Sequence, residues 1–573
     1  MCGIWCSVHP GISRCCEIEE LICNRGPDHK GRYSCRCADY TLDCWASVLH
    51  MRGSRLVEQP AVAPNGDVLL FNGEIYAGFD VEPQTSDTEV LFNALLNAEC
   101  PAECLAKVQG EFAFVFCQVS SGKLWFGRDV LGRRSLLWNY HHDAFIVCSV
   151  ISHCMQETAQ WFELPAAVIY CLDLSTFSSA FPTIECFHLR PDSDRISLPF
   201  LSSRFTVKQY SAAIDNSALF KINRCLINCP WPSKESINAL VENDDCTCLG
   251  VDCLRLVDWF LAHLRSAVKS RLHPMPPACR SCSTAGCDCT PSHCKVSVLF
   301  SGGVDSLLLA ALTLESLPAD SMPVDLLNVA FAQKSSSDFE VPDRISGRTG
   351  FELLRRLYSS QNLNLVQINV TKEELLEWRN RRIRHLVQPC DTVLDDTIGC
   401  ATWFAARGVG TILGDMQRYK SPAKISLVGT GADELLGGYA RHRTRFSQSG
   451  WTGLIEEMEM ELKRICSRNL GRDDRVIGDH GRESRLPYLD EAFVRFCNSI
   501  PINHKTDLTL PRGVGEKILL RLALCRLGLG AAAWLPKRAM QFGSRIAKLE
   551  NVKEKAGEKC DRLQVKMENK MHR

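Results

Sequence analysis

The sequence predicts two domains of different class, a strand-rich α+β domain followed by an α/β domain with a parallel sheet. The chain has 573 residues, which is more than one hydrophobic core supports. Residues 2–185 contain short apolar runs separated by Gly and Pro, such as Val68–Phe71 and Phe112–Phe116, a pattern typical of strands. From Lys295 onward, strand-like and helix-like runs alternate, which indicates a parallel sheet covered by helices.

The second domain is expected over residues 291–547, and its elements can be placed individually. Thr371 and Glu374 form a capping signal at the start of one helix. The predicted strands are Val296–Phe300, Val324–Phe331, Leu363–Val370 and Ile425–Val428, and the predicted helices are Leu307–Leu317, Lys372–Arg384 and Ala401–Arg407.

Two further regions flank this domain. Residues 186–290 mix Ser, Pro, Asp and Cys around helical stretches such as Leu254–Leu272, so we interpret them as a linker with a helix and partly disordered loops. Residues 548–573 are rich in Lys and Glu and are expected to form a solvated helix or a disordered tail.

Bulk composition excludes several classes of function. Lys plus Arg and Asp plus Glu are equal at 66 each, so no long-range field favours nucleic acid or an anionic membrane. No apolar run approaches the roughly 20 residues of a membrane helix, and the start MCGIWCSVHP lacks the pattern of a secretory signal. The 31 cysteines have no repeating spacing and are interpreted as reduced apolar side chains. We expect a cytoplasmic protein, and the oligomeric state stays open.

The first candidate site is Cys2. Removal of Met1 would leave a free α-amine on a residue that carries a thiol. An α-amine with a pKa near 8 can accept the thiol proton near neutral pH. One residue would then supply both nucleophile and base, although a cysteine at position 2 can also occur by chance.

Four further segments accompany Cys2 in a fixed order, namely NRGPD at Asn24–Asp28, FNGEIY at Phe71–Tyr76, SDTEVL at Ser86–Leu91 and GRDVL at Gly127–Leu131. Together they resemble the class II glutamine amidotransferase domain over residues 2–185. The resemblance implies an N-terminal-nucleophile fold, an αββα sandwich of two sheets between helices.

The resemblance also implies roles for particular residues. Cys2 would attack the side-chain carbonyl of glutamine and release ammonia, and Asn72 and Gly73 would form the oxyanion hole. Arg52 would bind the α-carboxylate of glutamine through its guanidinium fork. Asp87 would hold the α-ammonium, and the turn that includes Glu74 would complete the pocket. An ordinary surface arginine remains the alternative for Arg52.

The second candidate site is SGGVDS, which follows a predicted buried strand and precedes an apolar helix. In that context backbone N–H groups and the helix N-terminus favour phosphate. The site would comprise Ser301, Gly302, Gly303, Asp305 and Ser306, at the first strand-to-helix junction of a parallel sheet, where ligands bind. The hexapeptide resembles the pyrophosphate loop of enzymes that split ATP to AMP and pyrophosphate.

Later segments extend this resemblance to the asparagine synthetase family, and SRNLGRDDRVIGDHG and LPKRAMQFGSRIAK point to a divergent branch of it. The resemblance implies that Val329 meets the adenine, that Gly429 and Asp433 in GTGADELLGGY lie by the pyrophosphate, and that Lys517 in EKILLR offsets phosphate charge. GRESRLPYLD would line the amino-acid site. ATP with Mg²⁺, held through Asp305 and Asp433, would activate aspartate or a similar acid, and ammonia would reach it through a channel to give asparagine.

Three positions depart from the family pattern. Thr430 replaces a glutamate that handles the proton of the attacking ammonia, and threonine is no general base near neutral pH. Asp395 and Asp396 stand where the family has Thr and Arg around the adenylate. Arg482 replaces a small apolar residue. Two alternatives therefore stay open: an adenylating ligase with another acceptor acid, and a catalytically degenerate binding protein that keeps the fold.

One cysteine cluster has the spacing of a metal site. Cys279, Cys282, Cys287, Cys289, His293 and Cys294 lie within one short segment. The rest of the chain is also rich in cysteine, and short cysteine motifs match by chance. The sequence therefore does not favour zinc at this cluster.

Overall fold

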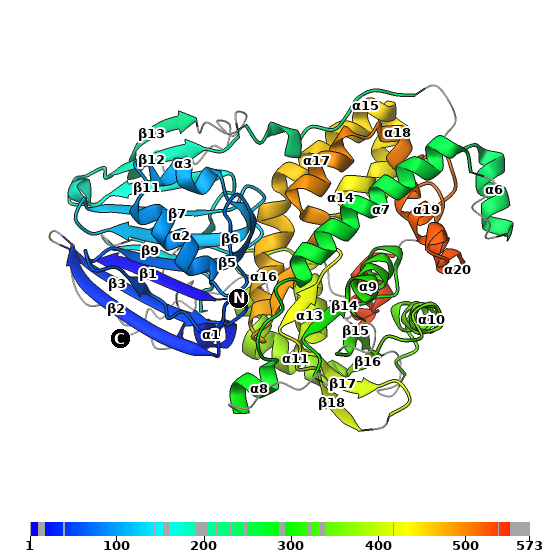
Figure 1. The fold of residues 1–573 in the computed structure, drawn as a ribbon, viewed down its shortest axis with the longest axis horizontal. Helices are drawn as coiled ribbons and strands as arrows, with labels where there is room; N and C mark the ends of the chain where they lie inside the picture. Colours follow the sequence, from blue (N-terminus) through cyan, green and yellow to red (C-terminus); the bar gives the residue numbers. More distant parts are fainter. Residues whose placement is uncertain are drawn as a thin grey trace, which may run out of the picture.

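Two sheets packed face to face form the amino-terminal domain in the computed structural model (Figure 1). The first has the strand order β10-β8-β9-β1-β3-β2 and the second β13-β12-β11-β7-β6-β5-β4. The first sheet comprises β1 (Gly3–His9), β2 (His29–Cys37), β3 (Tyr40–Val48), β8 (Leu137–His141), β9 (Ala144–Cys148) and β10 (Phe162–Glu163). The second comprises β4 (Ala61–Val62), β5 (Val68–Ala77), β6 (Gln109–Gln118), β7 (Lys123–Arg128), β11 (Val168–Asp173), β12 (Thr183–His188) and β13 (Thr206–Ser211).

The alternation of residues along β6 shows why these strands form a sandwich. Ala113 and Val115 point into the core between the sheets, whereas Phe112 and Phe114 point into a second core beneath helices, as the two-residue period of a strand requires. That second core is covered by α2 (Asp87–Leu96) and α3 (Pro101–Ala106), and α1 (Ile18–Arg25) packs on the first sheet. The predicted αββα sandwich is confirmed.

The second domain contains one seven-stranded sheet with the order β18-β17-β16-β15-β14-β19-β20. Its strands are β14 (Val296–Leu299), β15 (Val324–Phe331), β16 (Leu363–Val370), β17 (Val409–Ile412), β18 (Arg418–Lys420), β19 (Ile425–Leu427) and β20 (Glu483–Arg485). Five neighbouring strands of this sheet pair in parallel, namely β16, β15, β14, β19 and β20. Strands β17 and β18 add an antiparallel edge. The predicted parallel sheet is confirmed, and its antiparallel edge was not anticipated.

Helices surround this sheet (Figure 1). Thr371 caps α11 by accepting a hydrogen bond from the Glu374 N–H at 3.2 Å, and the helical chain then continues through a π-turn at Arg379–Ile383. The helices are α9 (Val304–Ser316), α10 (Pro342–Leu357), α11 (Lys372–Trp378), α12 (Arg384–Val387), α13 (Val393–Arg407), α14 (Ala432–Leu436), α15 (Ala440–Ile465), α16 (Gly471–Gly478), α17 (Glu491–Ser499), α18 (Ile502–Lys505), α19 (Ile518–Arg526), α20 (Gly530–Ala533), α21 (Met540–Gly543) and α22 (Ile546–Leu549).

The region between the domains differs from the expected linker. Strands β12 and β13 belong to the second sheet, so this sheet continues beyond the boundary expected at residue 185. The predicted linker helix is present as α7 (Val251–Leu272), which packs on α9, α17 and α19 of the second domain. Shorter helices α6 (Lys234–Asn243) and α8 (Arg280–Ala285) flank it.

The structure describes residues 2–9, 18–37, 40–141, 144–152, 155, 160–190, 204–211, 215–227, 232–243, 249–285, 293–318, 322–332, 338–415, 417–536 and 538–549. The expected tail therefore lies, from residue 550, outside the described residues, as do Cys287 and Cys289.

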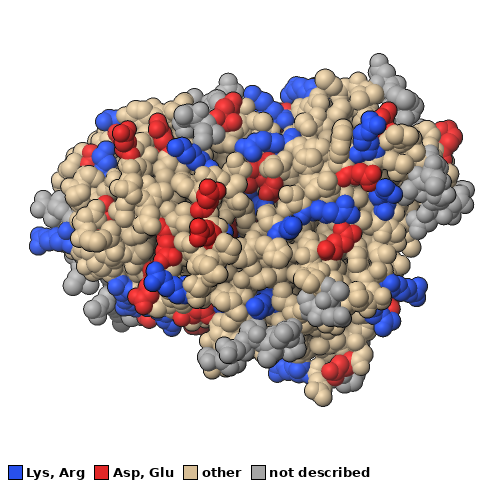
Figure 2. Space-filling view, viewed as in Figure 1, with Lys and Arg blue, Asp and Glu red and all other residues tan. Residues whose placement is uncertain are grey.

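Among the described helices, none combines the length and apolar character needed to cross a membrane. Basic and acidic side chains are interspersed over the face in Figure 2.

Buried ion pairs join the two domains. Arg485 of β20 lies 3.4 Å from Glu74 of β5, and Arg134 of the first domain lies 3.7 Å from Glu483 of β20. Although burial raises the pKa of Glu483, Arg485 and Arg134 hold it at about 2. Because an unpaired buried charge is costly, these pairs favour this arrangement of the two domains.

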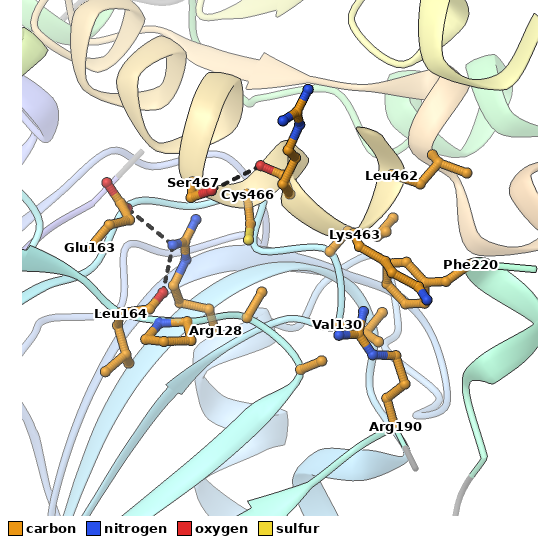
Figure 3. A pocket seen from close by; sticks show the side chains of 15 residues that line it. Arg128, Val130, Glu163, Leu164, Arg190, Phe220, Leu462, Lys463, Cys466 and Ser467 are labelled. Atoms are coloured by element: carbon orange, nitrogen blue, oxygen red, sulfur yellow. Dashed lines mark hydrogen bonds and ion pairs between the residues drawn. The ribbon is translucent and has the colours of Figure 1, made fainter. Parts of the chain in front are cut away.

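A cavity of about 220 Å³ also lies at the domain contact (Figure 3). Arg128 reaches Glu163 and the Leu164 carbonyl on its wall, at 3.1 and 2.8 Å. The cavity contains none of the predicted site residues, so the two candidate sites lie elsewhere.

Candidate active sites

Cys2 lies directly before β1 and is 9% exposed. Its backbone N–H donates to Asn72 Oδ1 at 2.8 Å, which ties the amino-terminal end of the chain to β5. Burial raises the pKa of the Cys2 thiol above its ordinary value. Because the thiolate is the nucleophilic form, this thiol needs a base close by, and an α-amine on the same residue would be the nearest one.

Asn72 and Gly73 follow each other in β5 beside Cys2. The Asn72 Nδ2 atom is buried and has no hydrogen-bond partner among the described residues, while its Oδ1 atom is engaged by Cys2. A Cβ atom at Gly73 would collide with the backbone of Glu111 and Phe112 in β6. The Asn72 side chain therefore offers an amide N–H donor that no described residue occupies. The next residue must be glycine, because a larger one would collide with β6.

Arg52 and Asp87 face each other across the same pocket. Arg52 Nη1 donates to Asp87 Oδ1 at 3.0 Å and to the Ile75 carbonyl at 3.1 Å. Burial raises the pKa of Asp87 to about 6, although Arg52 opposes the shift. Burial and then Asp87 also raise the pKa of Glu74 well above its usual range. The structure thus brings together all six predicted residues of the first site.

Gln59 belongs to this site and was not found from the sequence. Its side chain exchanges two hydrogen bonds with the backbone of Phe71, at 2.7 and 3.0 Å. Its Nε2 atom lies 3.9 Å from Cys2 Sγ. No motif marks this loop residue, because its place depends on how the loop folds over β5.

The pocket bounded by these residues is small, at about 40 Å³. One water needs roughly 10–15 Å³ of such space, so the pocket has room for only a few waters. Glutamine is larger, so side chains that line the pocket would have to move for it to bind.

The second site begins where β14 ends. Gly302 has φ of +74°, and a Cβ there would collide with the backbone of Ser346 and Gly347. Ser301 Oγ accepts from the Gly303 N–H at 3.2 Å, and Ser306 Oγ donates to the Gly303 carbonyl at 3.1 Å. The loop is thus a tight turn that leads into the N-terminus of α9, as expected for a phosphate site.

Lys517 joins the two predicted loops of the second site. Its Nζ atom lies 2.7 and 2.6 Å from the two carboxylate oxygens of Asp305 and also contacts Asp433. The Lys517 side chain is fully buried, and its backbone has φ of +57°. A non-glycine residue in this left-handed conformation carries strain, which is common at functional sites.

A cavity of about 330 Å³ opens in front of these loops. Of the predicted residues, it is lined by Ser301, Asp305, Ser306, Val329, Gly429 and Asp433. Four arginines to which no sequence motif assigned a role also line it, namely Arg441, Arg468, Arg472 and Arg538. Arg468, Arg472 and Arg538 lie in the two segments that set this chain apart from the family pattern.

The altered positions differ in their relation to this cavity. Thr430 lines it, whereas Asp395, Asp396 and Arg482 do not. Arg472 pairs with Asp395 at 2.6 Å and Arg379 with Asp396 at 3.1 Å, so an arginine offsets the negative charge of each carboxylate. Arg482 is fully buried and donates to the carbonyls of Ser421 and Ala423.

The segment 481–490 was expected to line the amino-acid site, yet none of its residues lines the cavity. Glu483 and Arg485 instead form the ion pairs at the domain contact. Tyr488 reaches the second site indirectly, since its hydroxyl donates to the Asp305 carbonyl at 3.0 Å. Residues 481–490 therefore contact residues of both sites without lining the cavity of the second site.

Glu434 is one of several carboxylates that line the cavity together with Thr430. It accepts from the Tyr439 hydroxyl at 2.7 Å and from Asn469 Nδ2 at 3.2 Å. Burial, followed by the neighbouring charge of Asp433, raises its pKa. A carboxyl group with a raised pKa is a candidate proton acceptor where Thr430 has none.

Comparison with known families agrees with the division of the chain into two domains that each hold one candidate site. A family model described as a glutamine amidotransferase domain matches residues 1–170, and one described as asparagine synthase matches residues 288–455 and 445–573. The chain is 40% identical to asparagine synthetase domain-containing protein 1 of Mus musculus, over 99% of this chain and 100% of that protein. It is 31% identical to an asparagine synthetase domain-containing protein of Drosophila melanogaster, over 98% and 100%.

Two more distant likenesses complete the comparison. The glutamine-hydrolyzing asparagine synthetase of Mus musculus is 24% identical, over 95% of this chain and 84% of that one. A glutamine phosphoribosylpyrophosphate amidotransferase structure from B. subtilis matches 58% of this chain and 67% of its own at 12% identity, with a TM-score of 0.25.

Proposed function

The chain belongs to the family of asparagine synthetase domain-containing proteins, and from this premise we propose that it is a glutamine-dependent, ATP-consuming ligase that forms asparagine from aspartate. One observation carries the proposal. A single chain places a thiol beside an idle amide donor in one domain and a lysine between two aspartates of glycine-rich loops in the other. The first arrangement suits amide hydrolysis and the second suits ATP cleavage.

In the glutamine step, the α-carboxylate of the substrate pairs with Arg52 and its α-ammonium group pairs with Asp87. These two contacts replace the ion pair between Arg52 and Asp87. The Cys2 α-amine accepts the thiol proton, and the sulfur attacks the side-chain carbonyl of glutamine. Asn72 Nδ2 and the Gly73 N–H donate to the developing oxyanion. Ammonia leaves with the transferred proton, and water then hydrolyses the thioester to glutamate.

In the ATP step, the loop from Ser301 to Ser306 holds the pyrophosphate portion and Val329 meets the adenine. A carboxylate of the acceptor attacks the α-phosphorus, and pyrophosphate leaves with Lys517 offsetting its charge. Asp305 and Asp433 offer the oxygen ligands that Mg²⁺ prefers, and the ion would supply further charge neutralisation when bound. Ammonia from the first site then attacks the acyl carbon and AMP departs.

A second candidate differs only in the acceptor acid. Thr430 lies in the cavity where a carboxylate is expected, and four arginines share that cavity. Arg441 and Arg472 pair with Glu461 and Asp395. Arg468 and Arg538 are therefore the candidate partners for an additional carboxylate of the acceptor. With either acceptor acid, Glu434, whose pKa burial raises, would take the proton of the attacking ammonia.

Isotope transfer tests the proposal. Chain from which Met1 has been removed is incubated with amide-¹⁵N glutamine, Mg-ATP and one acid at a time, including aspartate. We expect AMP together with ¹⁵N-labelled asparagine. Another labelled amide would select the alternative acceptor, and nucleotide binding without AMP from any acid would indicate a degenerate binding protein.

The Cys2→Ala variant supplies the matched control. It should form the same amide from free ammonia and none from glutamine, because only its first site is lost. Failure with ammonia as well would show that the second site is inactive.

We also propose a cytoplasmic location. The 31 cysteines have no repeating spacing, and buried thiols that contact each other, such as Cys6 and Cys44, suit a reducing compartment.

A further inference from the structure

Three potential metal ligands converge at the edge of the second domain, away from both sites. Cys282 Sγ lies 3.0 Å from His293 Nδ1, and Cys279 Sγ lies 3.7 Å from the same nitrogen. The three donor atoms all lie within 4.8 Å of one another. Within the described part of the chain, no other group of three His, Cys, Asp or Glu side chains converges in this way.

Two segments of chain bring these ligands together. Cys279 directly precedes α8 and Cys282 lies in its first turn, where the Ser283 N–H donates to the Cys279 carbonyl at 3.0 Å. His293 comes from the segment that leads into β14. The Arg280 N–H donates to the Pro422 carbonyl at 2.8 Å, which fixes α8 beside the sheet at the lower edge of Figure 1. The ligands are therefore positioned by ordered backbone.

The spacing agrees with a tetrahedral zinc site. Zn–S bonds of about 2.3 Å and Zn–N bonds of about 2.05 Å require S···N separations of about 3.6 Å. The two observed separations, 3.0 and 3.7 Å, lie on either side of this value. Small shifts of the Cys282 side chain would bring all three atoms to bonding distance of one ion.

Packing of apolar thiols explains this arrangement less well. Cys279 and Cys282 are buried, at 0% and 1% exposure, but an imidazole nitrogen faces both sulfurs and makes the site polar. The buried pair Cys6 and Cys44 shows the other case, in which two thiols contact each other in an apolar core. The sequence pattern alone does not distinguish these two cases, and the histidine geometry does.

We propose that Cys279, Cys282 and His293 bind one Zn²⁺ through two Sγ atoms and Nδ1, with a fourth ligand from outside this trio. Both thiols lose their protons on binding, so that two thiolates balance the charge of the ion. Thiolate and imidazole ligands select zinc over Mg²⁺, which separates this site from the ATP site. The ion would be structural, holding α8 to the segment before β14, whose far end becomes the Ser301 loop.

Metal content of the purified full-length chain tests the proposal. After dialysis against metal-free buffer, elemental analysis should find about one zinc per chain. Cys282→Ser and His293→Ala should each lose most of this zinc, whereas Cys225→Ser, at an exposed cysteine outside the cluster, should retain it. Full zinc in both cluster variants, or no zinc in wild type even after incubation with ZnCl₂, would overturn the proposal.

A measurement on unaltered protein covers the case in which the variants fail to fold. Removal of zinc with a strong chelator should lower the thermal midpoint, and added zinc should restore it. Replacement by Co²⁺ should give the visible bands of a tetrahedral ion and a thiolate charge-transfer band. If the thermal midpoint did not change on chelation and these cobalt bands did not appear, the site would be refuted. Neither readout depends on glutamine or ATP turnover, so the proposed function is tested separately.

Discussion

The two candidate sites differ in size and in the charges on their walls. The glutamine site measures about 40 Å³, and its Arg52 and Asp87 pair with each other. The second cavity measures about 330 Å³ and is lined by four arginines, several carboxylates and Thr430. A small pocket with one ion pair suits one small substrate. A larger cavity with altered lining leaves more freedom in the acceptor, so the choice between acceptor acids concerns the second site.

The largest effect should come from Lys517→Met. This change leaves Asp305 and Asp433 without their shared buried cation, so the ATP-dependent step should slow by about 10³-fold or more. Glutamate release at Cys2 should stay within about two-fold, because Lys517 contacts no residue of the first site. Pyrophosphate release and glutamate release, measured on the same sample, separate the two effects.

Lys505→Met is the matched control. Lys505 is also fully buried, but its Nζ atom has no hydrogen-bond partner within the described chain, and burial lowers its pKa to about 8. Its loss should leave both activities intact. If Lys505→Met and Lys517→Met lowered pyrophosphate release equally, Lys517 would have only a structural role.

The next effect concerns Asn72→Ala. Loss of one oxyanion donor typically lowers kcat by about 10²–10³-fold, and the KM for glutamine should change little because Arg52 and Asp87 hold the substrate. Amide formation from free ammonia should be unaffected. An Asn72→Ala chain that hydrolyses glutamine at the wild-type rate would show that the idle Nδ2 atom is no oxyanion donor.

The smallest effect is a pH dependence confined to the first site. Burial raises the pKa of Asp87 to about 6, so below this pH its carboxyl becomes neutral and no longer attracts an ammonium group. This protonation should therefore lower the kcat/KM for glutamine by about tenfold per pH unit below 6, in addition to the fall that protonation of the Cys2 α-amine causes below its own pKa near 8. The rate of amide synthesis from free ammonia should not show this decrease below pH 6.

Asp87→Asn provides the check on that assignment. The variant should be weakly active and should lose the limb near pH 6. A limb that persists in Asp87→Asn would assign it to another group, such as Glu74.

Much of this architecture could be predicted because local chemistry dictates it. The period-two pattern in β6 separates two cores, and the Gly302 turn requires a glycine. Strands β15 and β16 begin and end where their apolar runs do.

Other features depend on contacts between distant segments and left no local signal. Gln59 reaches Cys2 only because its loop folds over β5. The GRESR segment resembles a substrate wall in sequence, yet Arg485 meets Glu74 of the other domain. Strand β13 joins its sheet beside β12 across residues that sequence patterns assign to a linker.

We propose that Cys2 hydrolyses glutamine in a chain that also cleaves ATP. The most direct test measures glutamate release by Met1-processed wild type and Cys2→Ala, with and without Mg-ATP and aspartate. We expect release by wild type and loss of at least about 10³-fold in Cys2→Ala. Glutamate release that survives in Cys2→Ala, or that is absent from folded wild type under every condition, would contradict it.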